Sequence, residues 1–139
     1  MIHIREIDHV VIRVVDLDKM LWFYCSVLGC QIEREQKEIG LTQLRAGRSL
    51  IDLVTVDGVL GRAGGGSPSG SGRNMDHLCL RVEPFDAAAI KAHLRERGLN
   101  PGEVASRYGA EGQGPSIYVE DPEGNTVELK GPPAEPSPA

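Results

Sequence analysis

The pattern of apolar and polar positions divides the chain into two stretches, each predicting a strand, a helix and three further strands. In the first stretch, residues 7–15 form a β-branched run, which is typical of a strand. Apolar side chains then recur at helical spacing up to Gly29, and Asp16 or Asp18 can cap that helix. The strands expected after the helix alternate polar and apolar side chains over residues 31–36, 41–46 and 49–56.

The second stretch repeats this order of elements. The elements expected there are a strand at residues 76–82, a helix at 86–97, a weakly signalled strand near 102–106, and strands at 116–120 and 125–130. Residues 8–14 reappear 68 positions later as residues 76–82, and residues 51–53 match residues 127–129 at an offset of 76. The sequence therefore predicts a duplicated βαβββ unit. Because one such unit cannot cover both faces of its four strands, we expect two copies to associate into a larger curved sheet.

Composition separates the repeats from a linker and a tail. The 139 residues, 40% of them apolar, are enough for one medium domain. Residues 58–74 hold seven of the 17 glycines and predict a flexible linker, while residues 132–139 hold four of the nine prolines and predict a disordered tail. We therefore expect a single domain over residues 1–131, built from repeats at 4–57 and 75–131.

Charge and cysteine content narrow the candidate partners and the compartment. The net charge is −5 and no Lys/Arg-rich block occurs, so nucleic acid and anionic membranes are not expected as partners. No apolar run approaches the roughly 20 residues that cross a bilayer, and residues 1–6 carry no apolar signal segment. Three cysteines without a CxxC pair predict no disulfide framework, which favours a cytoplasmic location.

Each repeat places a histidine in its first strand and a carboxylate in its last. The two pairs are His9 with Asp52 and His77 with Glu128, all flanked by apolar neighbours. An ionised carboxylate in an apolar strand is costly unless another group compensates its charge. Imidazole and carboxylate together suit Zn(II), Ni(II), Fe(II), Co(II) or Mn(II). Any one of these residues alone is more often structural, but the repetition of the pair favours a metal site.

Strand alternation assigns faces to the neighbouring polar residues. Asp8 and Asp76 each precede a candidate histidine, so we expect them to point to the opposite face and not to support their neighbours' rings. Arg13 and Arg81 share the histidine face, where they can hold an anionic group of a substrate or end as solvated charges. Cys79 is expected to be a small buried side chain.

Four segments resemble the vicinal oxygen chelate superfamily, which includes glyoxalase I, fosfomycin-resistance proteins, methylmalonyl-CoA epimerase and extradiol dioxygenases. They are residues 8–12, residues 22–29 with the F-Y-x-x-x-L-G helix end, residues 76–78, and residues 121–129 with the D-P-x-G-x-x-x-E-L hairpin. The resemblance covers about residues 5–131. It implies an α+β fold of two tandem βαβββ modules that form a cupped eight-stranded mixed sheet with one divalent metal ion at its base.

The resemblance also implies residue roles. The family's metal ligands match His9, Asp52, His77 and Glu128, with Zn, Ni, Fe, Mn or Co all open as the metal. This set is similar to that of glyoxalase I and implies a lyase or isomerase. Such an enzyme acts on a small substrate with vicinal oxygens through an enediolate-type intermediate, with Glu128 as the base.

Two departures from glyoxalase I bear on the substrate. Arg13 matches an arginine of that family that binds a glutathione carboxylate. However, Asp52 stands where glyoxalase I has a glutamate, and Val56 stands where an asparagine contacts glutathione. Glutathione is therefore not the expected substrate.

The resemblance leaves two other functions open. Without Asp52, the remaining His9, His77 and Glu128 form a 2-His-1-carboxylate triad, which suits an Fe(II) ring-cleaving dioxygenase. A non-catalytic ligand-binding protein of the bleomycin-resistance type would need the cup but no metal ligands. Superfamily members often dimerise, so we expect a homodimer, with the cup formed either within one chain or across two.

Overall fold

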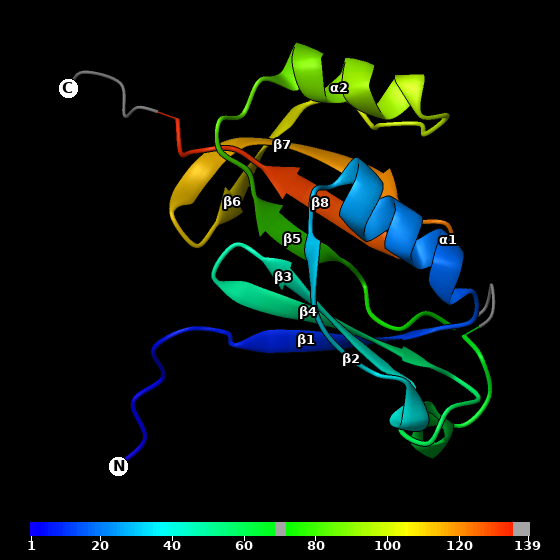
Figure 1. The fold of residues 1–139 in the computed structure, drawn as a ribbon. Coiled ribbons are helices and arrows are strands. Elements are labelled where there is room, and N and C mark those ends of the chain that lie inside the picture. Colours follow the sequence, from blue (N-terminus) through cyan, green and yellow to red (C-terminus); the bar gives the residue numbers. More distant parts are fainter. Residues whose placement is uncertain (69–71, 135–139) are drawn as a thin grey trace. The chain divides into compact units, whose positions relative to one another are not determined.

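A computed structural model describes residues 1–68 and 72–134 and divides the chain into two compact units, Met1–Asn74 and Met75–Ala139 (Figure 1). The predicted linker at residues 58–74 falls within the first unit, apart from residues 69–71, which lie outside the described residues. Residues 135–139 of the predicted tail also lie outside the described residues. The single-domain organisation of residues 1–131 stays a prediction.

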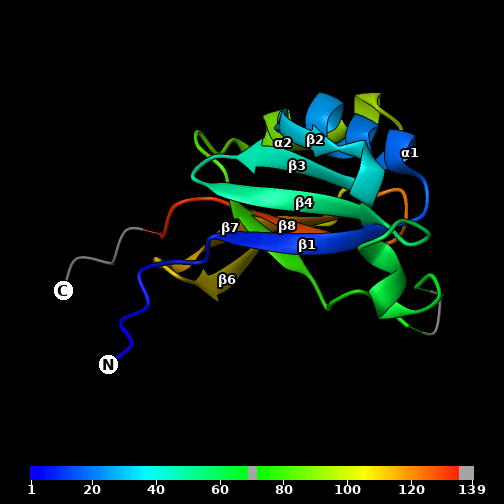
Figure 2. The same cartoon turned by 60° about the horizontal axis from the view of Figure 1, so that its bottom comes forward.

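The first unit is a βαβββ module. Its elements are β1 (His9–Val14), α1 (Leu17–Leu21), a π-helical segment (Trp22–Val27), β2 (Gln31–Gln36), a 3₁₀ turn (Lys37–Ile39), β3 (Leu41–Ala46), β4 (Ser49–Thr55) and a second 3₁₀ turn (Gly61–Gly64). Figure 2 shows the four strands side by side in the order β1-β4-β3-β2. β1 is parallel to β4, and the other neighbours are antiparallel.

The second unit repeats this topology. Its elements are β5 (Leu78–Arg81), α2 (Ala87–Glu96), β6 (Ala105–Gly109), β7 (Gly112–Glu120) and β8 (Thr126–Lys130), with strand order β5-β8-β7-β6. β5 is parallel to β8, as β1 is to β4. The α+β fold of two tandem βαβββ modules is therefore confirmed. Each module has its own four-stranded sheet, and the eight-stranded cup stays a prediction.

The second module differs from its expected outline at the β6–β7 hairpin. β6 begins at Ala105, later than the weakly signalled strand near residues 102–106, and β7 begins four residues before the predicted Ser116. The two strands pair as far as Gly109 and Gly112, so residues 108–114 extend a hairpin. The extra length of the second repeat therefore lengthens two paired strands.

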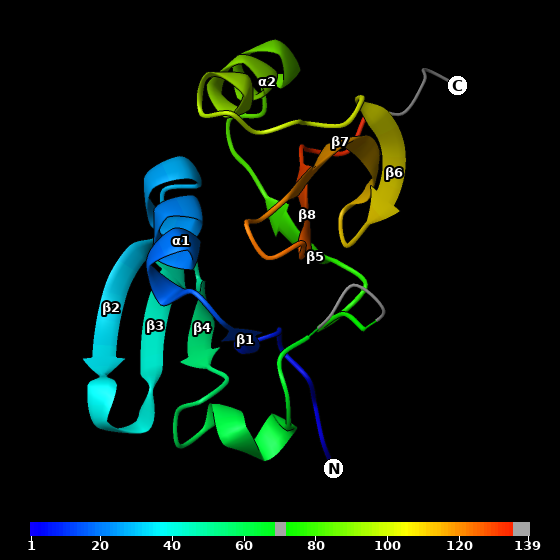
Figure 3. The ribbon, with the colours of Figure 1, turned by 90° about the vertical axis from the view of Figure 1, so that its right-hand side faces the viewer.

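Both helices begin at an aspartate whose side chain caps a backbone N–H group. Asp16 accepts from the backbone of Lys19 and Asp86 accepts from the backbone of Ala89, each at 3.1 Å. After α1, the chain continues as the π-helical segment, whose Phe23 is fully buried. Figure 3 shows α1 against the β2–β3–β4 part of its sheet. Over residues 1–68 and 72–134, no helix is long and apolar enough to cross a membrane.

Strand alternation gives each sheet one apolar face and one face with polar groups. On β1, Ile12 and Val14 are fully buried, while His9 and Arg13 lie on the other face with Asp52 of β4. On β8, Val127 and Leu129 are buried on one face, while Thr126, Glu128 and Lys130 share the other. The candidate residues of each unit therefore lie on the polar face of its sheet.

The turn between β7 and β8 is organised by the buried Asp121. One carboxylate oxygen accepts from the backbone N–H groups of Glu123 and Asn125, both at 2.9 Å. The other oxygen accepts from the Asn125 side-chain amide at 2.8 Å. This part of the D-P-x-G motif therefore serves the fold, because it fixes the turn that leads into β8 and Glu128.

We expect Asp121→Ala to lower the free energy of unfolding by about 2–4 kcal/mol, because three hydrogen bonds to a buried carboxylate are lost. Urea denaturation followed by circular dichroism measures this loss. The matched control is Asp57→Ala, at an exposed position, which should change stability by less than about 0.5 kcal/mol. Equal, small effects of the two substitutions would contradict a structural role for Asp121.

Candidate functional site

The first unit brings His9 and Asp52 together on the polar face of its sheet. Asp52 of β4 lies opposite Val11 of β1, so His9, two residues earlier, points to the same side. The distance from His9 Nε2 to Asp52 Oδ2 is 3.9 Å. Asp52 is only 4% exposed; Gln43 donates to its Oδ2 at 3.2 Å, whereas its buried Oδ1 has no hydrogen-bond partner among the described residues.

The second unit holds the equivalent pair more tightly. His77 Nε2 lies 3.2 Å from Glu128 Oε1, and Glu128 is 5% exposed. Cys79 lies opposite Glu128 in the β5–β8 pairing, at the position that Val11 has opposite Asp52. The Tyr118 and His77 rings form an edge-to-face contact with a centroid distance of 5.6 Å. The predicted pairing of histidine and carboxylate within each repeat is therefore present.

The aspartate before each histidine supports its ring, so the expectation that Asp8 and Asp76 face away is wrong. His9 Nδ1 lies 2.7 Å from Asp8 Oδ1, and His77 Nδ1 lies 2.7 Å from Asp76 Oδ1. Both aspartates precede the paired strand residues, so strand alternation does not fix their side chains. The Asp-His dipeptide, present in both repeats, was the available sequence signal.

This support determines what the other ring nitrogen can do. A neutral ring that donates from Nδ1 to a carboxylate keeps its lone pair on Nε2. In both units, Nε2 is the nitrogen that faces the buried carboxylate. A carboxylate behind Nδ1 is the usual partner of a metal-binding histidine, because it fixes the tautomer and the ring orientation.

The hydrogen bond that His9 Nδ1 donates to the Asp8 carboxylate also raises the pKa of His9 above its ordinary value. The negative charge of Asp52 raises the pKa further, and desolvation acts in the opposite direction with a smaller effect than the Asp8 hydrogen bond. The raised pKa stabilises the fold while His9 is protonated. That contribution is present below the unfolded-state pKa and is lost as the pH rises through the folded-state pKa.

The two pairs fit the requirements of a divalent cation. Burying a carboxylate costs several kcal/mol unless a positive charge or hydrogen bonds compensate it, and Asp52 Oδ1 has no such partner among the described residues. Imidazole nitrogen with carboxylate oxygen is a donor set that first-row divalent metals take. Within either unit, as far as it is described, no three His, Cys, Asp or Glu side chains group as a metal site. Each unit therefore brings together one imidazole nitrogen and one carboxylate.

The two arginines of the histidine faces are held by their own units. Arg13 donates from Nε, Nη1 and Nη2 to the carbonyls of Gly61, Gly66 and Gly65. Its guanidinium lies so close to Gly64 that a Cβ there would be 2.4 Å from Nε, so a larger residue at this position would displace the guanidinium. Arg81 donates to the Glu111 carboxylate at 2.8 Å. Substrate roles for Arg13 and Arg81 stay predictions.

Cys79 is exposed, which corrects the expectation of a small buried side chain. It lies on the polar face because it pairs with Glu128 across the two parallel strands. Partial burial, and then the Glu128 charge, raise the pKa of the thiol to about 11, so it stays protonated at neutral pH. This places Cys79 beside the candidate base as a neutral group.

Sequence reasoning missed a group of polar residues on the same face of the second sheet. Arg107 donates to the backbone carbonyl of Ser116 at 3.0 Å and to its hydroxyl at 2.9 Å. The guanidinium lies 4.2 Å from the centre of the Tyr118 ring, which is a cation–π contact. Ser116 faces Lys130 and Tyr118 faces Glu128 in the β7–β8 pairing. The candidate base therefore has two cationic side chains on its face.

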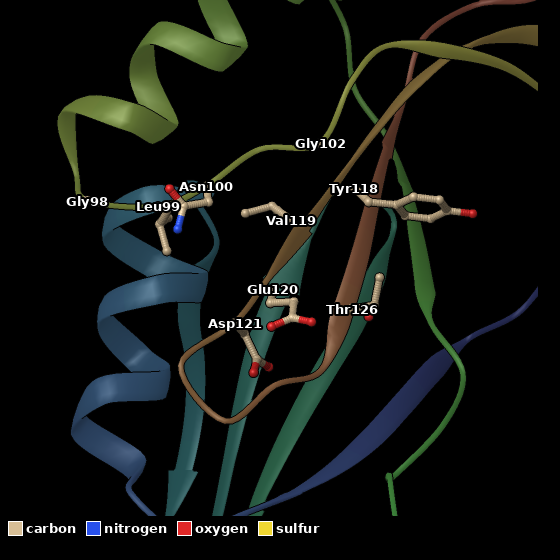
Figure 4. Close-up of a pocket in the computed structure, with 9 residues that line it drawn as sticks. All are labelled: Gly98, Leu99, Asn100, Gly102, Tyr118, Val119, Glu120, Asp121 and Thr126. Carbon is tan, nitrogen blue, oxygen red and sulfur yellow. The ribbon is translucent and has the colours of Figure 1, made fainter. Parts of the chain in front are cut away.

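A hollow of about 530 Å³ lies in the second unit (Figure 4). It is lined by the loop from Gly98 to Gly102, by β7 from Tyr118 to Glu120, and by Asp121 and Thr126. Tyr118 lies opposite Glu128, and Thr126 precedes Glu128 by two residues on the same face. Through Thr126, the hollow therefore borders the start of β8, the strand that carries Glu128.

Comparison with known proteins identifies similar chains and folds. Residues 6–129 match the family model described as Glyoxalase/Bleomycin resistance protein/Dioxygenase superfamily. The chain is 32% identical over 127 residues to a Synechocystis protein named "Probable lactoylglutathione lyase", covering 87% of this chain and 91% of the relative. It is 25% identical over 134 residues to the human mitochondrial methylmalonyl-CoA epimerase, covering 92% of this chain and 74% of the relative.

Solved structures show the same fold. A virulence protein from Salmonella typhimurium superposes with a TM-score of 0.75 at 25% identity, covering 94% of this chain and 99% of that protein. A lactoylglutathione lyase from Agrobacterium tumefaciens superposes with a TM-score of 0.62 at 18% identity, covering 91% and 92% of the two chains. These likenesses extend over both βαβββ modules.

We expect Asp8→Ala to lower the pKa of His9 in the metal-free protein, because the substitution removes the hydrogen bond that holds the ring protonated. NMR titration of the histidine ring protons measures the shift. The control Asp18→Ala changes an exposed aspartate in the same unit and should leave the His9 titration unchanged. Identical His9 titrations in wild type and Asp8→Ala would contradict the assigned role of Asp8.

Proposed function

Because the chain belongs to the Glyoxalase/Bleomycin resistance protein/Dioxygenase superfamily, we propose that it is a divalent-metal-dependent lyase or isomerase. Its substrate is a small molecule with vicinal oxygens, and the reaction proceeds through an enediolate-type intermediate. The observation that carries the proposal is the repeated arrangement in which an aspartate supports a histidine that faces a buried carboxylate. The names of the two sequence relatives support the choice of reaction class.

The residues that would hold the metal are His9, Asp52, His77 and Glu128. Both histidines have Nε2 available, because Nδ1 is engaged by the preceding aspartate. Asp52 Oδ1 is a buried oxygen that has no hydrogen-bond partner in the described ranges, and a cation would compensate it. A bound divalent ion would act as a Lewis acid, polarising the substrate oxygens and stabilising the negative charge that develops on them.

Glu128 is the proposed base that moves a proton at the carbon beside the substrate carbonyl. It is almost fully buried, and one of its oxygens lies 3.2 Å from His77 Nε2. Its side chain is one methylene longer than that of Asp52, which gives its carboxylate the longer reach towards a substrate. The neutral Cys79 thiol beside it adds no competing charge.

The contacts of Arg13 bear on the size of the substrate. Three of its donors are engaged by backbone carbonyls of residues 61–66, so binding a substrate carboxylate would require it to leave them. Together with Val56 at the position of the glutathione-contacting asparagine, this favours a substrate smaller than a glutathione adduct. Arg81 would likewise have to exchange Glu111 for the substrate.

A ring-cleaving Fe(II) dioxygenase is the second candidate, and one contact favours it. Gln43 donates to Asp52 Oδ2, so part of the Asp52 charge is already compensated within the first unit. If that compensation is sufficient, His9, His77 and Glu128 form the triad with open positions that such enzymes use. The two candidates therefore differ in whether Asp52 binds the metal.

Metal titration of single variants distinguishes these candidates. Wild-type protein, stripped with a chelator and reloaded with Zn(II), Ni(II), Mn(II) or Fe(II), should bind about one ion per chain. For the lyase, Asp52→Ala should weaken binding by about 10–100-fold while Asp52→Glu is tolerated. For the dioxygenase, Asp52→Ala should bind normally. His9→Ala, His77→Ala or Glu128→Ala should abolish binding in both cases.

The matched control for metal binding is His3→Ala, which removes an exposed histidine and should bind metal as wild type does. A wild-type protein that stays metal-free after reloading with all four ions would contradict both enzyme candidates. It would leave a ligand-binding protein of the bleomycin-resistance type.

The proposed base predicts solvent exchange. In D₂O, the metal-loaded protein should exchange the carbon-bound protons of dihydroxyacetone or dihydroxyacetone phosphate, which carry vicinal oxygens. Glu128→Gln should slow the exchange by about 10²–10⁴-fold per bound metal ion, because the proton acceptor is lost. Proton NMR measures the exchange, with Glu38→Gln at an exposed position as the control. Oxygen uptake with catechol in place of exchange would contradict the lyase.

A further inference from the structure

Lys130, the last residue of β8, has a buried side-chain ammonium group. No group in the described part of the chain accepts a hydrogen bond from it. The residue is 6% exposed, and its Nζ is buried without a hydrogen-bond partner in the described ranges. Elsewhere in the same unit, Lys91 donates to the Glu103 carboxylate at 3.1 Å. An ammonium group that is removed from water and left unpaired is unfavourable for the fold. Folding stability therefore does not explain why a lysine occupies this buried position.

Lys130 lies on the same face as the proposed base. Residues two apart on a strand point to the same side, so Lys130 and Glu128 are neighbours on the polar face of the second sheet, about 7 Å apart along the strand. Ser116 lies directly opposite Lys130 on β7 and is fully buried. Its hydroxyl oxygen accepts from Arg107, so its own proton can be donated to a ligand.

The backbone of β6 makes room for the lysine side chain. A Cβ at Gly109 would lie 2.5 Å from Lys130 Cε and 3.0 Å from Cδ, so any larger residue there would displace the lysine. The alkyl part of Lys130 therefore lies across Gly109. The second cation of this face, Arg107, is held by Ser116 and by the Tyr118 ring.

We propose that Lys130 binds an oxyanion group of the substrate, a carboxylate or a phosphate, with the Ser116 hydroxyl as a second donor and Arg107 adding positive charge. A compact oxyanion matches an ammonium point charge with a hydroxyl beside it. This inference rests on the proposed function, because the oxyanion would be part of the molecule on which Glu128 acts. The substrate class is then a small acid or phosphate ester whose charged group lies a few bonds from its vicinal oxygens.

The test measures anion binding to the full chain before and after metal loading. Inorganic phosphate and acetate are titrated separately by calorimetry, and the melting temperature is recorded at matched ionic strength. We expect at least one of the two anions to bind and to raise the melting temperature, and the tighter one identifies the group. Lys130→Met should weaken that binding by at least tenfold and should not lower the melting temperature of the anion-free protein, because a buried unpaired charge is removed.

Two further variants make the result specific to the Lys130 position. Lys91→Met, which removes a lysine paired with Glu103, should leave anion affinity unchanged. Gly109→Ala, which crowds Lys130 without removing its charge, should weaken anion binding while metal content stays at the wild-type level. It keeps the proposal testable if Lys130→Met does not fold.

Several outcomes would overturn the inference. They are failure of both anions to bind the wild type, equal anion binding by wild type and Lys130→Met, or a lower melting temperature of folded, anion-free Lys130→Met, which would make the lysine structural. If Lys130→Met does not fold, wild-type anion affinity in Gly109→Ala would overturn the inference. The proposed function can fail independently of this inference. If the wild type takes up no metal yet binds phosphate through Lys130, the proposed lyase activity is contradicted and the anion site is supported.

Discussion

Two carboxylates buried in apolar strands determine how the polar face of each sheet is organised. Asp52 and Glu128 lie in the last strand of their modules with apolar residues on both sides, and each is nearly inaccessible to water. An uncompensated charge there would cost several kcal/mol, a large part of a typical domain's stability. The histidine faced by each carboxylate, and the aspartate behind that histidine, place an imidazole nitrogen beside a buried carboxylate oxygen in each module.

The parallel pairing of the first and last strands makes this arrangement possible. In both modules the last strand lies beside the first, with Val11 opposite Asp52 and Cys79 opposite Glu128. The histidine two residues earlier then falls on the same face without any special local structure. The buried Asp121 turn brings β8 back along β7, and so fixes the position of Glu128. The family motifs therefore contain fold-forming residues such as Asp121 together with the candidate ligands His9, His77 and Glu128. Lys130 and Arg107 lie outside these motifs.

Much of this could be predicted from the sequence because it follows from short-range patterns. The alternation in residues 31–36, 41–46 and 49–56 matched three strands almost to the residue, and the repeated histidine and carboxylate positions predicted both pairs. The errors arose where a side chain is controlled by something other than strand alternation. Asp8 and Asp76 lie before the paired residues, so their side chains turn towards the adjacent ring.

Other features depend on contacts between residues far apart in sequence. Nothing in the local pattern indicates that Arg13 would be held by carbonyls of residues 61–66, about fifty residues later. A lysine at the end of a strand ordinarily reaches solvent, and only the packing across Gly109 shows that Lys130 does not. The roles of such residues can be predicted only from the tertiary structure, because they depend on burial and on distant contacts and not on residue type.

A crystal structure of the metal-loaded protein, with anomalous diffraction data collected at the absorption edge of the metal, would show which side chains bind the ion. We expect one strong peak about 2.0–2.2 Å from Nε2 of His9 and of His77 and from a carboxylate oxygen of Glu128. Nδ1 of each histidine should still face Asp8 or Asp76. An oxygen of Asp52 at the same distance would identify the four-ligand lyase site. A peak at any other group of residues, or none at full metal loading, would contradict a metal site at His9, His77 and Glu128.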